Sequence, residues 1–183
     1  MFFDVIFVIY TLGNIYLGIR YGLFRRVVHV GAFLLGMLLA QALSPGLAEQ
    51  FGYNTGPNPA DSHFGVFLAI VFAIVAIAEV LGFAYASALA FLNALLGDRL
   101  FGALLGLVAS VLEASIILYL FSQLVSVTLP SGGSHAGIIG SSLDQVNSSI
   151  VLKQVKRVQG LTLLLFRPVL PPEPGTYFAK TYS

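Results

Sequence analysis

One carboxylate stands in the middle of an apolar stretch that is long enough to cross a membrane. Glu113 is the only charged residue between about residues 101 and 127. An ionised carboxylate that faces lipid at this depth costs about 2.5 kcal/mol or more, so such residues usually face a bundle interior or a water-filled path. Two interpretations follow: Glu113 binds protons or cations in a transport path, or it is a protonated or hydrogen-bonded group that holds helices together.

Small residues before Glu113 predict where its side chain points. Gly106 and Gly102 lie seven and eleven residues earlier, which places each within about 20° of the same face of a helix with 3.6 residues per turn. Such a stripe lets a neighbouring backbone approach closely, so we expect Glu113 to point into a seam between helices. The residues that we expect at close helix contacts are Gly18, Gly22, Gly102, Gly106 and Ser110.

Two further polar residues lie in apolar stretches. Glu79 falls in the third such stretch, and Asn14 falls in the first. Counting residues along each stretch places Glu79 about one and a half turns from the depth of Glu113, so we do not expect the two carboxylates to pair directly. We expect Asn14 to hydrogen bond across helices, as amides within membrane bundles do.

A basic cluster separates the first two apolar stretches. It consists of Arg20, Arg25 and Arg26. Basic residues in short connections mark the cytoplasmic side of a membrane protein, and they also attract anionic lipid head groups. We expect the cluster on the cytoplasmic side, either as a determinant of topology alone or as a lipid-binding patch as well.

The patterns of known enzyme sites are missing from the sequence. His29, His63 and His135 lack the i, i+4 spacing of a helical metal site, and the chain has no cysteine and no phosphate-binding glycine loop. We therefore expect no catalytic residues, no metal and no cofactor. A net charge of +1 also argues against nucleic acid as a partner.

The composition is that of an integral membrane protein. Hydrophobic residues make up 57% of the chain and charged residues 9%, against roughly 45–50% and 25% in soluble domains. We predict an all-α fold in which residues 1–128 form a bundle of four transmembrane helices within the lipid bilayer. The predicted spans cover about residues 1–19, 26–43, 64–86 and 101–127, and the second should stop at Ser44-Pro45-Gly46.

The remaining residues, 129–183, are predicted to form a flexible linker and a tail. A short amphipathic helix should run from Ser149 to Gln159, with Gly160 just past its end. Leu161–Phe166 is too short to span a membrane, and the proline-rich segment from Arg167 onward should close it in extended form. Lys153, Lys156 and Arg157 give this helix basic charge. Two interpretations remain open: the helix lies on the membrane surface, or it is solvated and packs back on the bundle.

The basic residues also predict orientation. The connection between the first two spans contains three arginines, whereas the connection between the second and third contains no basic residue. The first connection should therefore lie in the cytoplasm, which leaves both termini outside it. The basic residues of the tail argue the other way, but they are too far from the last span to count strongly.

Two segments carry a resemblance to a known family. The first is the run Gly18–Arg25, which follows Asp4 in the opening segment and leads into a helix with Gly31 and Gly36. The second is the glycine-rich run Leu92–Leu107 at the start of the last span. In their order along residues 1–128 these elements resemble the CvpA family, the colicin V production proteins. The resemblance implies a small four-span protein of the bacterial inner membrane.

Three hypotheses of function follow. The first, implied by the resemblance, is a non-enzymatic scaffold or accessory factor in envelope homeostasis and toxin production or export, with envelope or secretion proteins as partners. The second is a small ion- or proton-coupled transporter or channel that uses Glu113, which would act as a homo-oligomer. The third is a membrane anchor whose tail recruits a partner.

Overall fold

The computed structural model describes residues 2–51, 59–84, 96–128 and 149–179. Within these ranges the chain is helical and contains no strand. The elements are α1 (Phe2–Gln50), α2 (Pro59–Ala84), α3 (Leu96–Thr128), α5 (Ile150–Phe166), the short 3-10 helix η3 (Arg167–Val169) and α6 (Pro174–Ala179). The predicted flexible linker, residues 129–148, lies outside the described residues.

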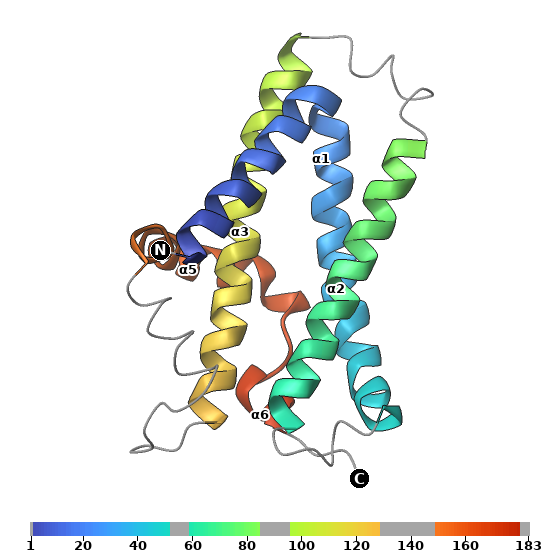
Figure 1. Ribbon diagram of the computed structural model, residues 1–183, viewed down its shortest axis with the longest axis vertical. Helices are drawn as coiled ribbons and strands as arrows, with labels where there is room; N and C mark the ends of the chain where they lie inside the picture. The colour runs from blue at the N-terminus through green and yellow to red at the C-terminus, as the bar shows by residue number, and fades with distance from the viewer. Residues whose placement is uncertain (1, 52–58, 85–95, 129–148, 180–183) are drawn as a thin grey trace.

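Three of the described helices are long and apolar enough to cross a membrane: Asp4–Gln50, Ser62–Ala84 and Gly97–Val125. The prediction of an all-α membrane bundle is therefore confirmed. The first of these helices is sharply bent at Gly22, whose φ of 77° and ψ of −177° belong to a region that essentially only glycine occupies. We call residues 2–21 the N-terminal arm and residues 23–50 the long arm. The chain rises along the first arm to the bend and descends along the second, so both arms lie on the same side of the bend (Figure 1).

The bundle consists of two helix pairs. The N-terminal arm lies along α3, and the long arm lies along α2, whereas α2 and α3 have few contacts with each other (Figure 1). The buried apolar core lies between these helices and the tail. It comprises Phe33, Met37, Ala40, Ala60, Phe64, Phe67, Val71, Ile116, Leu120, Leu124, Phe166, Tyr177 and Phe178.

The second predicted span was too short at its C-terminal end. The long arm continues to Gln50 with Pro45 inside it. Proline has no amide proton, so the carbonyl of Gln41, four residues earlier, loses its helical partner. The hydroxyl of Tyr177 donates to this carbonyl at 2.8 Å. A tail residue thus satisfies the group that Pro45 leaves free, and the helix passes through the proline.

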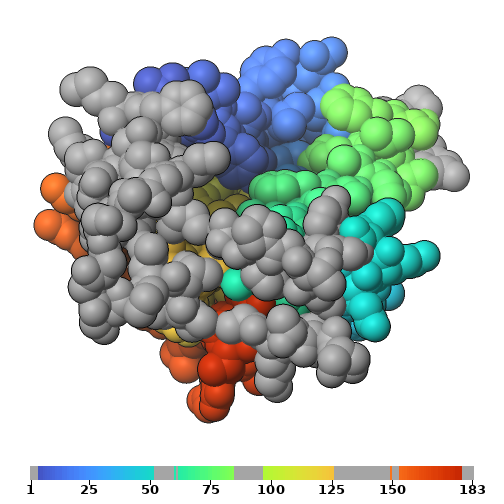
Figure 2. Space-filling model, turned by 60° about the horizontal axis from the view of Figure 1, so that its bottom comes forward, coloured from blue at the N-terminus to red at the C-terminus, as the bar shows by residue number. Residues whose placement is uncertain are grey.

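The tail also differs from its prediction. α5 continues through Gly160 to Phe166, and η3 and α6 follow where an extended segment was expected. Glycine inside a helix costs about 1 kcal/mol, but the extra turns place Thr162 and Phe166 in buried positions, so packing outweighs propensity. α6 closes the end of the bundle opposite the Gly22 bend; Figure 2 turns this end toward the viewer, with α6 in red and the end of α1 in cyan.

Candidate functional site

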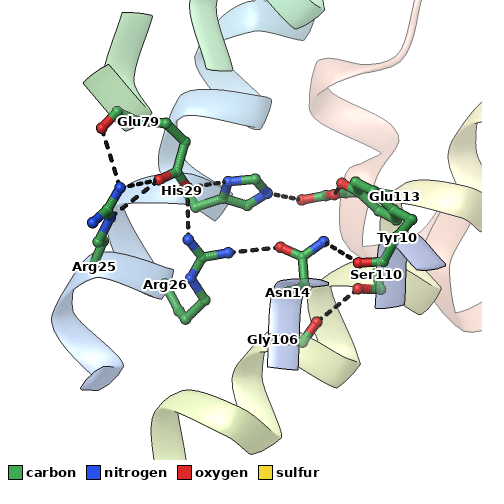
Figure 3. A network of polar contacts seen from close by, with 9 residues as sticks. All are labelled: Tyr10, Asn14, Arg25, Arg26, His29, Glu79, Gly106, Ser110 and Glu113. Carbon is green, nitrogen blue, oxygen red and sulfur yellow. Dashed lines mark hydrogen bonds and ion pairs between the residues drawn. The ribbon is translucent and has the colours of Figure 1, made fainter. Parts of the chain in front are cut away.

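The bend at Gly22 positions the polar residues of the long arm. The amide of Leu23, the first residue after the bend, donates to Asp98 Oδ1 of α3 at 3.1 Å. A carboxylate is a favourable acceptor for the free amides at a helix N-terminus. This contact fixes the start of the long arm, whose next turns carry Arg25, Arg26 and His29 toward the centre of the bundle (Figure 3).

Glu79 of α2 receives both of these arginines. Its Oε2 accepts from Arg25 Nη2 at 2.6 Å and from Arg25 Nε at 3.1 Å, and its Oε1 accepts from Arg26 Nη2 at 2.6 Å. The Arg25 guanidinium also lies 3.7 Å from the ring centroid of Phe83 and 4.1 Å from that of Tyr21. The Arg26 side chain is fully buried, and such a charge needs an ionic partner. Glu79 supplies it.

His29 connects the carboxylates of Glu79 and Glu113. Its Nδ1 lies 2.8 Å from Glu79 Oε1, and its Nε2 lies 3.1 Å from Glu113 Oε1, an ion-pair distance without the geometry of a hydrogen bond. A protonated imidazole has a donor for each carboxylate, whereas a neutral ring has only one. Glu79 and Glu113 are thus joined through His29 and not by a direct contact.

The network reaches the N-terminal arm through Tyr10 and Asn14. The Tyr10 hydroxyl donates to Glu113 Oε2, and Arg26 Nη1 donates to Asn14 Oδ1 at 2.6 Å. The Asn14 amide in turn donates to the carbonyl of Tyr10 at 3.2 Å. We call this set the polar network: Tyr10, Asn14, Arg25, Arg26, His29, Glu79 and Glu113 (Figure 3).

The polar network includes all three intramembrane polar residues singled out from the sequence. Glu113, only 3% exposed, lies between α3 and the N-terminal arm, and Asn14 is 4% exposed. Sequence reasoning missed Tyr10 and His29. A single tyrosine or histidine in an apolar helix carries no spacing signal, although the demand of a buried acid for a cationic partner could have indicated His29.

The expected basic cluster is divided in the structure. Arg20 is exposed and donates to the Tyr16 hydroxyl at 3.1 Å, whereas Arg25 and Arg26 are buried against Glu79. The lipid-binding alternative is therefore wrong for Arg25 and Arg26, while the placement of the three arginines on the cytoplasmic side stays a prediction. The physical reason is the acidic side chain on α2, which attracts both guanidinium groups into the bundle.

Glycines allow the N-terminal arm to approach α3 closely enough for these contacts. A Cβ atom at Gly102 would lie 2.5 Å from the Gly18 carbonyl oxygen and 2.6 Å from the Gly22 carbonyl carbon, and one at Gly106 would lie 2.5 Å from the Asn14 carbonyl oxygen. A Cβ at Gly18 would overlap the Gly102 carbonyl. Ser110, next along the stripe, is buried and donates to the carbonyl of Gly106 at 2.9 Å. Four of the predicted small residues, Gly18, Gly22, Gly102 and Gly106, thus line this seam.

A second, smaller polar cluster lies at the end of the bundle that α6 closes. Ser44 Oγ is 3.0 Å from His63 Nε2 and 3.1 Å from the Tyr177 hydroxyl. A serine beside a histidine resembles part of a hydrolase site, but Ser44 and His63 are 0% and 1% exposed, and the imidazole packs against the rings of Tyr177 and Phe178. These contacts tie the tail to α1 and α2.

Among the residues that the structure describes, no group of three or more histidine or carboxylate side chains could hold a metal ion. The polar network brings together carboxylates, an imidazole, a phenol and two guanidinium groups. Chemically, such a set can clamp four helical segments by ion pairs, and its carboxylates and imidazole can also exchange protons.

Comparison with known proteins gives one result. The family model described as Colicin V production protein matches residues 3–163, which extend from the N-terminal arm into α5 and beyond the segments that carried the resemblance. No curated protein and no solved structure matches the chain. Because the family model covers most of the chain, the resemblance is confirmed: this membrane protein belongs to the Colicin V production protein family.

Proposed function

We propose that the protein is a non-enzymatic scaffold or accessory factor of the bacterial cytoplasmic membrane, acting in toxin production or export and in envelope homeostasis. The observation that carries this proposal is the continuous family match over residues 3–163. A scaffold needs a rigid set of membrane helices more than it needs a reactive group. The polar network is consistent with that need.

The charges of the polar network support a structural role. Both arginines pair with Glu79, and His29 lies between Glu79 and Glu113. The two positive charges of the arginines and the two negative charges of the carboxylates balance when His29 is neutral. Hydrogen bonds and ion pairs join both arms of α1 to α2 and α3, and thereby connect the two helix pairs. Removing one partner of a buried ion pair costs about 3–5 kcal/mol. The network therefore acts as a clamp between the pairs.

The direct test is complementation of a deletion strain. The wild-type chain should restore release of the peptide toxin and tolerance of detergent or bile salt. Glu113→Gln should restore both in proportion to its abundance in the membrane, since glutamine keeps a hydrogen-bonding group for Tyr10. A deletion that changes neither toxin release nor detergent tolerance would count against the proposal.

The partners of such a scaffold would be envelope or secretion proteins, or further copies of the chain. Extraction in a mild detergent, followed by cross-linking and copurification, should recover at least one of these. Recovery of the chain alone and monomeric, under conditions that preserve toxin release, would contradict the scaffold proposal.

In this proposal the chain crosses the membrane four times, with both arms of α1 as separate crossings and both termini outside the cytoplasm. Arg20 and Arg99 are exposed near the bend and at the start of α3, which favours the cytoplasm for that end. The absence of cysteine allows clean labelling. In intact cells an impermeant maleimide should modify Glu49→Cys but not Arg99→Cys, and the reverse pattern would overturn the orientation.

A second candidate function is proton- or cation-coupled transport. The specific observation in its favour is the succession of exchangeable groups from Glu79 through His29 and Glu113 to Tyr10. Proteoliposomes under a pH or voltage gradient provide the test. Proton flux that Glu113→Gln abolishes would favour transport over the scaffold, and absence of flux in the wild type would exclude the candidate.

A further inference from the structure

The position of α5 follows from its tie to the N-terminal arm. Ser149, immediately before α5, donates its hydroxyl to Asp4 Oδ1 at 2.5 Å. Asp4 lies in the first turn of the N-terminal arm, which spans residues 2–21 and is about 30 Å long at 1.5 Å per residue. The hydrocarbon core of a bilayer is also about 30 Å thick. We therefore expect the start of this arm, and with it the start of α5, to lie near the membrane interface opposite the bend.

α5 runs across the bundle behind α3 and not along it (Figure 1). It packs mainly on α3 and also on α1. The face toward the bundle carries Val155, Thr162 and Phe166, all buried, at the i, i+7 and i+11 positions of one helix stripe. With 17 residues and a basic N-terminal half, α5 is too short and too polar to span a bilayer.

The opposite face of α5 changes character along its length. Lys153, Gln154 and Arg157 are exposed in the N-terminal half. In the C-terminal half Leu161, Leu164 and Leu165 are 61%, 71% and 59% exposed. These leucines are as exposed as the side chains that surround the apolar helices of the bundle, such as Val80 at 65%.

We propose that this face of α5 is a binding surface for anionic phospholipid of the bilayer in which the bundle sits. The leucines enter the upper part of the acyl chains, and Lys153 and Arg157 contact the phosphate groups. The interfacial position, the exposed leucines and the complementary charge each point to this occupant. The inference rests on the membrane location of the chain and not on its role in toxin production.

A single tryptophan tests the depth of α5, because the chain contains none. Leu164→Trp is made in the full chain and reconstituted in vesicles of phosphatidylcholine and phosphatidylglycerol with brominated acyl chains. Bromine near the carbonyl end should quench the tryptophan more strongly than bromine near the bilayer centre. The control is Phe72→Trp in the middle of α2, where the exposed side chain should show the opposite order.

Two results would overturn the depth assignment. Emission typical of water without bromine quenching would place this face of α5 in solvent. Protection of the tryptophan from both bromine and aqueous iodide would show that protein, such as a second copy of the chain, covers the leucines.

A charge variant tests the choice of lipid. In the Leu164→Trp background, brominated phosphatidylglycerol should quench more strongly than brominated phosphatidylcholine. Lys153→Gln with Arg157→Gln should weaken this preference by roughly fivefold for each charge removed, with quenching by phosphatidylcholine unchanged. Arg99→Gln, an exposed charge at the other end of the bundle, is the matched control and should keep the preference. An unchanged preference in the double variant would refute head-group binding. This result is independent of the toxin-release assay that tests the proposed function.

Discussion

Substitution of Glu79 by glutamine probes the polar network at its most heavily charged point. Glu79 accepts from Arg25 and Arg26 and contacts His29. Glutamine has nearly the same volume and still offers a carbonyl oxygen, so the change removes charge with little change in packing. It leaves two guanidinium groups inside the bundle without their carboxylate.

The expected loss of stability follows from burial. Removing one partner of a buried ion pair costs about 3–5 kcal/mol. The side chain of Glu79 is 18% exposed, whereas those of Arg25 and Arg26 are 8% and 0% exposed, so partial hydration of Glu79 favours the lower limit. We therefore expect Glu79→Gln to lower the free energy of unfolding by about 3 kcal/mol.

Glu113→Gln is the matched control on the other side of His29. Its contacts are the Tyr10 hydroxyl and one imidazole nitrogen, with no guanidinium group within ion-pair distance among the described residues. Loss of a hydrogen bond to a charged group costs about 1.5–3 kcal/mol, and glutamine retains part of it. The expected loss is therefore about 1 kcal/mol, clearly smaller than that of Glu79→Gln.

Reversible unfolding in mixed micelles, titrated with sodium dodecyl sulfate and followed by circular dichroism, measures both values. Combining Arg26→Gln with Glu79→Gln should cost less than the sum of the single changes, because the unpaired charge of Arg26 is then absent and only Arg25 is left without its carboxylate. Equal stability of Glu79→Gln and the wild type, or strict additivity with Arg26→Gln, would refute the ion pairs as described.

Three further substitutions test the geometry that positions the network, each by the same unfolding titration. Gly102→Ala should destabilise by about 1–3 kcal/mol because its Cβ would overlap the Gly18 and Gly22 backbones. The control, Gly13→Ala, should be neutral or stabilising because no atom lies within 4 Å of the added Cβ. Equal effects of the two changes would contradict the close contact between the N-terminal arm and α3. Gly22→Ala should cost about 1–3 kcal/mol through its φ of 77°, and an unchanged stability would argue against the bend. Asp98→Ala should cost about 0.5–2 kcal/mol by removing the acceptor of the Leu23 amide, and Asp98→Asn should recover most of this loss.

The membrane helices and the buried face of α3 could be predicted from the sequence. Runs of apolar residues longer than a soluble helix needs located the membrane helices, and the seven- and eleven-residue spacing before Glu113 predicted a seam on the face where that side chain lies buried. Both signals are local and periodic. They require no knowledge of a partner helix.

The errors arose where a distant residue decides the local structure. The long arm passes through Pro45 because Tyr177, far along the chain, satisfies the carbonyl of Gln41. Arg25 and Arg26 are buried in the bundle because Glu79 lies on the facing helix. Neither contact has a signature in the sequence near the residue concerned.

The most direct test of the account is the ability of Glu113→Gln to replace the wild-type chain in a deletion strain, with membrane abundance measured by immunoblot. If the polar network is a clamp within a scaffold, toxin release and detergent tolerance will recover in proportion to the amount of protein in the membrane. A Glu113→Gln protein that accumulates normally and restores neither would contradict the clamp and show that a titrating carboxylate is required.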